Sequence, residues 1–324
     1  MTARPLRLGT RASALALWQT EQVRVRLADQ GYTTERVEIR TTGDVVQDVP
    51  LPLIGSRALF TKQLDDALLD NRIDLAVHSL KDLPTVLPKG ITLGAVGLRE
   101  DARDALVARN GCTWATLPHG GAVATSSLRR RAQLLRARPD LAIVDIRGNV
   151  DTRLAKLDRN ADWAAVLLAS AGLVRLGFGA RISERLSIDI MLPAPGQGAL
   201  AATVRTGDTV ALEAVRRALH DGDTEIAVAA ERAFLRRLEG GCQVPIAAFA
   251  QVNRHQGQAV VHLRGRVLSL GGDATVEGAR IGPAPTAAEA DRLGVALAEE
   301  LLSQGADAIL RSVRDAGTEA VSEP

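Results

Sequence analysis

The chain has 324 residues, of which 46% are hydrophobic and only 2% aromatic, and its formal net charge is +2. This length predicts about two or three domains with aliphatic cores, and the balanced charge argues against a polycation that acts mainly on nucleic acid or membranes. Two cysteines cannot form a disulfide framework, and no apolar run approaches the ~20 residues of a membrane span, so we expect a soluble, cytoplasmic protein.

The first hundred residues alternate between strand and helix patterns. A strand is expected at the apolar start, residues 6–8, and apolar residues recur at helical spacing from Ala14 to Ala28. The run IDLAVHSL (73–80) is nearly continuous in apolar residues, which is typical of a strand covered by helices on both faces. We therefore expect an α/β domain over residues 1–98.

The same alternation then begins again. Strand patterns occur at residues 121–127, 141–146 and 164–170, and they predict a second α/β domain over residues 103–193. The segment LPAPGQGALAATVR (192–205) ends in a strand pattern that could return to the first domain, which would then include residues 198–218. Two α/β domains joined by crossing segments normally hold a ligand between them.

The last third of the chain has a different pattern. An apolar stripe from Ile226 to Phe234 predicts a helix, and strand patterns follow at 246–253, 258–268 and 274–281. A final helix is expected around Leu293 and Leu301. Together these elements predict a small α+β domain over residues 222–318.

The segment TSSLRRRAQLLRAR (125–138) predicts a helix with three arginines in its first turn. Leu128, Ala132 and Leu135 would form its buried stripe, and Ser126 or Ser127 would cap it. Cations in the first turn oppose the helix dipole at a cost of ~0.3–1 kcal/mol each, whereas a bound anion would reverse that effect. We interpret the segment as an anion site; the alternative is a solvated basic face.

Further arginines follow the ends of predicted strands, where ligands bind in open α/β sheets. Taken singly, each is an ordinary surface residue, but together they predict a cleft for several carboxylates or phosphates. No P-loop and no GxGxxG pattern occurs, and stacking aromatics are few, so small polycarboxylates fit better than nucleotides or nucleic acid. The residues that lie beyond the predicted strand ends in this way are Arg11, Ser13, Arg147, Arg153 and Arg175.

The segment HSLKDLP (78–84) follows another strand pattern. A turn would allow both Lys81 and Asp82 to approach one ligand, and a carboxylate among arginines stays ionised and can transfer protons. The alternative is a turn cap or a surface ion pair. His78 lies within the apolar run and is interpreted as a core or cleft-edge residue. Scattered histidines and two distant cysteines predict no metal site.

The two cysteines lie in different contexts. Cys112 is interpreted as a small buried hydrophobe. Cys242 follows two glycines in LEGGCQVPI (238–246), which favours an exposed turn, but no histidine nearby in the sequence is placed to activate its thiol. Its local sequence alone leaves Cys242 without a role.

Six motifs in order along the chain resemble one family, the hydroxymethylbilane synthases or porphobilinogen deaminases. They are RLGTRASALALWQ, HSLKDLPT, TSSLRRRAQL, IRGNVDTRLAKL, LPAPGQGAL and ERAFLRRLEGGCQVPI. The resemblance implies two α/β domains like those of type II periplasmic binding proteins and a small α+β C-terminal domain, a three-stranded sheet with helices. It also implies a monomeric transferase that joins four porphobilinogen molecules into linear hydroxymethylbilane and releases ammonia.

The resemblance further implies a dipyrromethane cofactor, bound by a thioether to Cys242, and a catalytic role for Asp82. It assigns cofactor contacts to Ser79, Lys81, Thr125, Ser126, Ser127, Arg129 and Arg130. It assigns substrate contacts to Arg11, Ser13, Arg57, Arg147, Arg153 and Arg175. In the segment SRALF (56–60), Arg57 stands where the family usually has lysine, and the two side chains differ in geometry.

Two other classes of function stay open at this point. The two α/β domains alone would suit a non-catalytic binder of a small anion, which would have no use for a modified Cys242. A nucleic-acid binder acting through the arginine-rich helix would show strongly salt-dependent affinity.

Overall fold

The computed structural model describes residues 4–41, 61–239, 244–256 and 258–322. These residues form two compact units, one built from 4–41, 61–100 and 198–225 and the other from 101–197 and 226–322. The first unit contains one β-sheet and the second contains two. Across the described ranges, none of the helices has the length and apolarity needed to cross a membrane.

The first sheet has the strand order β2-β1-β3-β10-β4. Its strands β1, β2 and β3 are parallel, whereas β10 is antiparallel to both β3 and β4. The predicted return of the chain to the first sheet is therefore confirmed. The elements of this unit are β1 (Leu6–Thr10), α1 (Ala14–Asp29), β2 (Thr34–Glu38), α3 (Lys62–Leu69), β3 (Leu75–Ser79), β4 (Ile91–Val96), β10 (Leu200–Arg205) and α7 (Thr209–Leu219).

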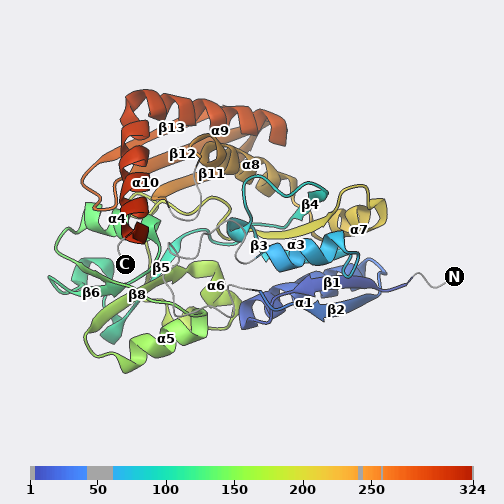
Figure 1. Ribbon diagram of the computed structural model, residues 1–324, viewed down its shortest axis with the longest axis horizontal. Coiled ribbons are helices and arrows are strands. Elements are labelled where there is room, and N and C mark those ends of the chain that lie inside the picture. Colours follow the sequence, from blue (N-terminus) through green and yellow to red (C-terminus); the bar gives the residue numbers. More distant parts are fainter. Residues whose placement is uncertain (1–3, 42–60, 240–243, 257, 323–324) are drawn as a thin grey trace. The chain divides into compact units, whose positions relative to one another are not determined.

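Helices cover both faces of the first sheet (Figure 1). On β3, Leu75 and Val77 belong to one apolar cluster, which includes residues of α1 and α7. Ala76 points the other way and joins a cluster that includes Leu64 and Leu68 of α3. Because successive side chains of a strand alternate between faces, both clusters need apolar residues from β3. This explains the continuous apolar run in the sequence.

The second sheet has the strand order β7-β6-β8-β5-β9. Here β6 is parallel to β7 and β8, and β5 is antiparallel to β8. In both sheets, three neighbouring parallel strands are followed in the strand order by one antiparallel strand, β10 in the first sheet and β5 in the second, which confirms the prediction of two α/β sheets. The elements are β5 (Asp104–Ala108), β6 (Ala122–Ala124), α4 (Leu128–Ala137), β7 (Ala142–Val144), α5 (Val150–Arg159), β8 (Trp163–Ala169), α6 (Ser170–Arg175) and β9 (Glu184–Arg185).

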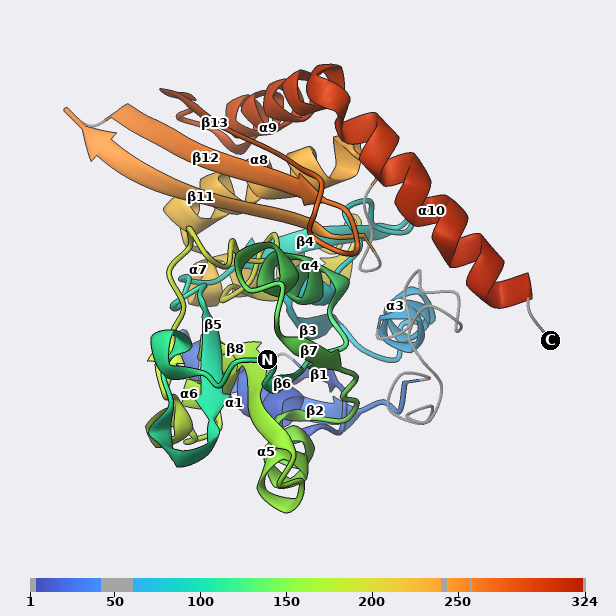
Figure 2. The ribbon, with the colours of Figure 1, turned by 90° about the vertical axis from the view of Figure 1, so that its left-hand side faces the viewer.

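The third sheet is an antiparallel meander of β11 (Ile246–His255), β12 (Gln258–Leu268) and β13 (Thr275–Pro283). Helices α8 (Gly222–Arg237) and α9 (Ala287–Leu301) pack beside it, and a short π-helical turn leads into α10 (Asp307–Ser322) (Figure 2). A Cβ on Gly294 of α9 would lie 2.1 Å from the carbonyl oxygen of Ala230, so the close contact of α8 and α9 requires glycine. The predicted α+β region is confirmed, and α10 is an addition that the sequence patterns missed.

The division into three domains stays a prediction. Each sheet lies within one of the expected ranges, 1–98 with 198–218, 103–193 and 222–318. The contacts that residues make in space nevertheless group the second and third sheets into a single unit. A buried hydrogen bond from Arg266 of β12 to Gln133 of α4 is one of the links between them.

Candidate active site

The first candidate residues lie at the carboxyl end of β3, where the chain enters the short 3-10 helix η2 (Leu80–Asp82). The backbone N–H of Leu80 donates to the carbonyl of Ala199, which fixes this turn against the residue that precedes β10. Asp82 is partly buried, and no donor among the described residues contacts its carboxylate. The turn thus presents a carboxylate that no described residue of its unit neutralises.

Ser79, the last residue of β3, is held by a buried glutamine. Gln19 of α1 donates a 2.7 Å hydrogen bond from Nε2 to the Ser79 hydroxyl oxygen. An amide N–H can only donate, so this contact leaves the hydroxyl proton of Ser79 available to a ligand. Gln19 ends the motif RLGTRASALALWQ but was not proposed as a site residue, because a polar residue within a helix is usually exposed.

His78 is a neutral core residue, as the sequence analysis expected. It is buried, and its Nε2 lies 3.1 Å from the hydroxyl oxygen of Thr203 on β10. Burial lowers the pKa of His78 to about 3, and the nearby charge of Arg11 lowers it in the same direction. An imidazole with this pKa is uncharged near pH 7, so Asp82 is the better candidate for proton transfer at this turn.

Arg11 and Ser13 follow β1 at the same edge of the first sheet. Ser13 is the N-cap of α1, and its hydroxyl oxygen accepts a 3.4 Å hydrogen bond from the backbone N–H of Ala16. Capping uses an oxygen lone pair, so the Ser13 hydroxyl proton stays available. The first unit therefore places Arg11, Ser13, Ser79 and Asp82 at the carboxyl ends of two adjacent parallel strands.

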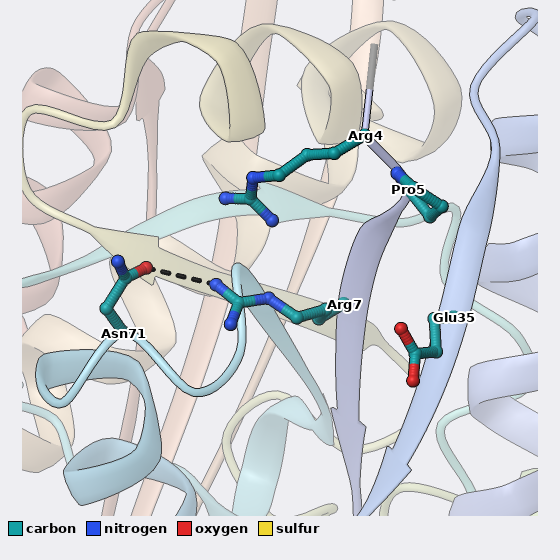
Figure 3. Close-up of a pocket in the computed structure, with 5 residues that line it drawn as sticks. All are labelled: Arg4, Pro5, Arg7, Glu35 and Asn71. Atoms are coloured by element: carbon teal, nitrogen blue, oxygen red, sulfur yellow. Dashed lines mark hydrogen bonds between the residues drawn. The ribbon is translucent and has the colours of Figure 1, made fainter. Parts of the chain in front are cut away.

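A pocket at the opposite end of these strands is a separate feature. It is lined by Arg4, Pro5, Arg7, Glu35 and Asn71, which precede the strands or lie at their beginnings (Figure 3). Both arginines are paired with Asp74, which is 1% exposed. Ligands of open α/β sheets bind at carboxyl strand ends, so this pocket is not the predicted site.

In the second unit, three hydroxyl side chains precede α4. Ser127 is the N-cap, and its oxygen accepts from the backbone N–H of Arg130. The backbone N–H of Ser127 in turn donates to the hydroxyl oxygen of Thr125. Ser126 both donates to the carbonyl and accepts from the N–H of Ile146, so its hydroxyl fastens the chain just before Arg147.

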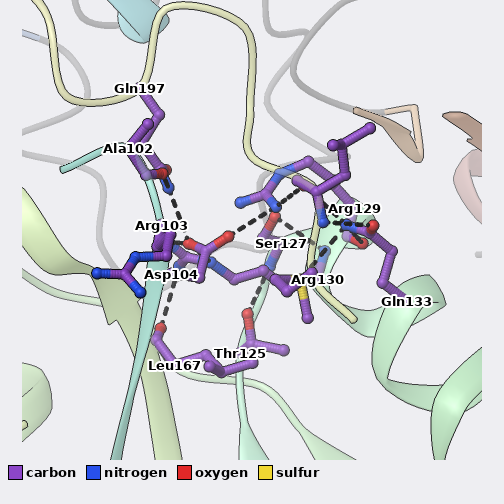
Figure 4. A network of polar contacts seen from close by, with 12 residues as sticks. Ala102, Arg103, Asp104, Thr125, Ser127, Arg129, Arg130, Gln133, Leu167 and Gln197 are labelled. Atoms are coloured by element: carbon purple, nitrogen blue, oxygen red, sulfur yellow. Dashed lines mark hydrogen bonds and ion pairs between the residues drawn. The ribbon is translucent and has the colours of Figure 1, made fainter. Parts of the chain in front are cut away.

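Arg129 and Arg130 point into the unit and share one buried carboxylate, that of Asp104 (Figure 4). Arg129 Nη1 donates to Asp104 Oδ2 at 2.8 Å and to the carbonyl of Leu192. Arg130 donates from Nε and Nη2 to Asp104 Oδ1, at 2.9 and 2.7 Å, and from Nη1 to the carbonyl of Leu167. The first-turn arginines are thus partly neutralised inside the fold, a pairing that was not expected from the sequence.

The predicted buried stripe of α4 is partly wrong. Ala132 is buried as expected, but Leu128 and Leu135 are only partly buried. The inward face instead carries Arg129, Arg130, Gln133 and Leu134. The hydrogen bonds to Asp104 and to backbone carbonyls allow these polar residues to replace leucines on that face. Arg131 is exposed, so the three consecutive arginines differ in role.

Arg147 follows β7 and has a buried donor without a partner. Its Nη1 atom is buried and makes no hydrogen bond to any described residue. An unpaired buried guanidinium nitrogen is costly, which makes it a candidate for a ligand contact. Arg153 donates from Nε to the carbonyl of Gly148 at 2.7 Å, and Arg175 is a buried residue at the end of α6.

Three expectations about the cysteines and Arg57 have different outcomes. Arg57 and Cys242 lie outside the described residues. Cys112 packs against an apolar cluster of the second sheet but is only half-buried, so it is less buried than the small hydrophobe that was expected. The described residues contain no group of three or more acidic, histidine or cysteine side chains that could hold a metal ion.

The donors near α4 fit a group that carries carboxylates. The Nε and Nη2 atoms of Arg129 have no acceptor among the described residues, and together they form the edge of a guanidinium that binds a carboxylate bidentately. Hydroxyl protons of Thr125 and Ser127 and the orphaned Nη1 of Arg147 add further donors in the same unit. The residues present are therefore compatible with a polycarboxylate cofactor.

Two family models match the chain. The model described as "Porphobilinogen deaminase, dipyromethane cofactor binding domain" matches residues 6–214, and the model of the porphobilinogen deaminase C-terminal domain matches residues 225–303. The chain is 49% identical to a porphobilinogen deaminase of Syntrophotalea carbinolica, over 97% of both chains. It is 48% identical to that of Geobacter metallireducens, over 97% of this chain and 96% of the relative.

Solved structures give weaker likenesses. A YaeC-family lipoprotein of Enterococcus faecalis aligns over 69% of this chain and 94% of its own, at 13% identity and a TM-score of 0.41. A periplasmic substrate-binding protein of an ABC transporter from Coxiella burnetii aligns over 67% and 92%, at 16% identity and a TM-score of 0.42. At these TM-scores the two likenesses add nothing to the fold described above.

Proposed function

The chain belongs to the porphobilinogen deaminase family, and we propose that its described side chains divide the family's reaction between the two units. The activity is that of a transferase, which joins four porphobilinogen molecules into linear hydroxymethylbilane and releases ammonia. The match over 97% of the chain carries this conclusion. The monomeric state and the cytoplasmic location expected from the sequence stay predictions.

In the first unit, we assign the chemistry to Asp82. Loss of the amino group of porphobilinogen requires a proton on nitrogen and leaves positive charge on the pyrrole. A carboxylate to which none of the described residues donates a hydrogen bond can hold that proton and stabilise that charge. Its place beyond β3, beside Ser79, supports this role. Arg11 and Ser13, beyond the neighbouring strand, would hold the carboxylates of the incoming pyrrole.

In the second unit, we assign the cofactor's carboxylates to the start of α4. The dipyrromethane group supplies the pyrrole to which the first substrate is joined, and it carries acetate and propionate side chains. Thr125 and Ser127 would donate hydroxyl protons to them, and Arg129 would bind one bidentately. Lys81 of the first unit is a further candidate. Ser126 would act indirectly, because its hydroxyl is bonded to Ile146.

Arg130, Arg147, Arg153 and Arg175 complete the proposed set of cations. Each pyrrole adds two carboxylates, so a growing chain accumulates negative charge that several guanidiniums must balance. The Nη1 of Arg147, which is buried and finds no partner within the described ranges, is the observation that best supports a substrate contact for this group. Arg57 stays a candidate on sequence grounds alone.

Intact-protein mass spectrometry tests the proposal. Purified wild type should carry the extra mass of two linked pyrroles, and Cys242→Ser should lack it. Cys112→Ser is the matched control, because it removes the other thiol of the chain and should keep the extra mass. A folded wild type without any extra mass would contradict the proposal and would favour a simple anion binder.

A further inference from the structure

Asp104 stands at the centre of the buried polar contacts of the second unit. It is the first residue of β5, and its side chain is fully buried. Its two oxygens accept hydrogen bonds from Arg129, Arg130 and Gln197 (Figure 4). None of the sequence motifs described above includes Asp104, and the proposed function gives this residue no role.

The three charges leave the cluster with a net charge of +1. Two guanidiniums beside each other repel, and a buried carboxylate between them removes most of that repulsion. Burial lowers the pKa of Arg129, and the charge of Asp104 raises it again. Without Asp104, two adjacent cations would have to stay buried without a counter-ion, and at least one would have to move toward solvent.

The contacts of Asp104 also fix where its partners point. Arg129 is held at Nη1 by both Asp104 and the carbonyl of Leu192, which leaves the Nε–Nη2 edge without an acceptor among the residues that the structure describes. On the other side, Gln197 Nε2 donates to Asp104 Oδ1 at 3.1 Å and to the carbonyl of Ala102 at 2.8 Å. The carboxylate is therefore held on both sides, so it orients Arg129 instead of following it.

We propose that Asp104 is a positioning residue of the cofactor site, which holds Arg129 and Arg130 so that carboxylates of the dipyrromethane meet a preformed guanidinium edge. This role rests on the proposed function, and it assigns Asp104 no contact with the cofactor or substrate. Preorganised donors lose less conformational entropy on binding than mobile ones, so the benefit appears in the loading of the cofactor.

A purely structural role is the alternative, and Asp74 of the first unit provides a matched control. Asp74 is equally buried and is bonded to three arginines, Arg4, Arg7 and Arg205. It lies at the end of the first sheet away from Asp82 and belongs to no proposed contact with cofactor or substrate. Replacing either aspartate by asparagine removes a buried charge, but only Asp104 is bonded to Arg129 and orients it.

The experiment compares full-length wild type, Asp104→Asn, Asp104→Glu and Asp74→Asn. Intact mass gives the fraction that carries the cofactor and its rise with time when the purified protein is incubated with porphobilinogen. Thermal unfolding gives Tm, and kinetics on the loaded fraction give KM and kcat. We expect Asp104→Asn to slow loading by about tenfold to hundredfold, the loss typical of a removed charged hydrogen bond.

Asp74→Asn should lower Tm and still load at the wild-type rate. The positioning role would be overturned if Asp104→Asn loaded the cofactor at the wild-type rate. It would also be overturned if the loading rates of Asp104→Asn and Asp74→Asn fell only in proportion to their losses in Tm. Should Asp104→Asn fail to fold, Asp104→Glu decides, because it keeps the charge and moves the carboxylate by one methylene. Slowed loading of the folded Asp104→Glu supports the role, and wild-type loading refutes it. The loaded state of wild type itself tests the proposed function separately.

Discussion

Arg266 Nη1 donates a 2.8 Å hydrogen bond to Gln133 Oε1, and both side chains are buried. The same amide accepts from the backbone N–H of Leu192 at 2.9 Å and donates to its carbonyl at 3.0 Å. One glutamine thus connects β12 of the third sheet, helix α4 and the segment that leads toward β10. Its burial makes each of these contacts costly to lose.

Gln133→Leu should destabilise the protein by about 3 kcal/mol, because it leaves the backbone N–H of Leu192 and one guanidinium nitrogen of Arg266 buried without partners. The carbonyl of Leu192 keeps its hydrogen bond from Arg129. Arg266→Met should cost less, since Gln133 keeps its bonds to Leu192. Urea unfolding of both single variants and the double variant measures the coupling, which we expect at about 1–3 kcal/mol. Strictly additive effects would show that the two side chains act independently.

The protein should lose the stabilisation that the ionised Asp74 carboxylate provides when the pH becomes acidic. Burial would raise its pKa, but hydrogen bonds from Arg4, Arg7 and Arg205 outweigh burial and hold that pKa below the ordinary value of 3.8. For a depressed pKa, the stabilisation is present above about pH 4 and is lost as the pH falls further. Asp74→Asn should cost about 3–5 kcal/mol at neutral pH, because three arginines lose their shared counter-ion.

The difference in unfolding free energy between Asp74→Asn and wild type should shrink below about pH 4, because the Asp74 carboxylate then takes up a proton in unfolded wild type but stays charged in the folded protein. Asp70→Asn is the control, because Asp70 is exposed and its ion pair with Arg72 is long, at 3.6 Å. It should change stability by less than about 0.5 kcal/mol at any pH. A constant difference between Asp74→Asn and wild type from acid to neutral pH would refute this account of Asp74.

Asp65 of α3 should make the stability of the protein depend on pH in the opposite direction. Burial raises its pKa from 3.8 to about 6, and its Oδ1 has no hydrogen-bond partner among the described residues. A raised pKa means that stability is complete below about pH 4 and falls as the pH rises through 6. Asp65→Asn should therefore stabilise the protein at neutral pH, by up to about 3 kcal/mol.

Urea unfolding at about pH 4 and about pH 7.5 measures this effect, which should be nearly absent at the lower pH. The neighbouring Asp66 provides the control, since it is half-exposed and paired with Lys62 at 2.8 Å. Asp66→Asn should lack any stabilisation that grows with pH. An equal response of both variants would show that burial of Asp65 is not the cause.

The sequence predicted those elements whose pattern is local. The meander of β11, β12 and β13 was expected from alternating residues over nearly the same ranges that the structure shows. Patterns of this kind depend only on neighbours in the chain and on which face is buried. For the same reason, the carboxyl strand ends near Arg11, Asp82 and Arg147 could be found before the structure.

The polar contacts inside the second unit could not be predicted, because they join residues far apart in the chain. Asp104 and Asp101 lie three residues apart and look alike in sequence, but Asp101 pairs with Arg103 near the surface whereas Asp104 is fully buried. Likewise, nothing local distinguishes the buried Arg130 from the exposed Arg131. Only the fold decides which of these charges meet.

Replacing Arg147 should weaken substrate binding without lowering the stability of the protein. Its Nη1 is buried and has no partner in the described part of the chain, so Arg147→Met should leave the unfolding free energy unchanged or slightly higher. Loss of the proposed contact to a pyrrole carboxylate should raise KM for porphobilinogen by about tenfold to hundredfold. Arg131→Met, which removes an exposed arginine, should leave KM unchanged. An unchanged KM in Arg147→Met would remove Arg147 from the substrate site.

Asp82 gives the most direct test of the chemistry. Asn has nearly the same shape as Asp but cannot accept a proton, so Asp82→Asn should lower kcat by about 10²–10⁴-fold. No described residue donates a hydrogen bond to the Asp82 carboxylate, so its Tm should stay near that of wild type. Intact mass should still show the cofactor, which would separate a defect in turnover from a defect in loading. Substantial turnover in Asp82→Asn would refute the assignment of proton transfer to this residue.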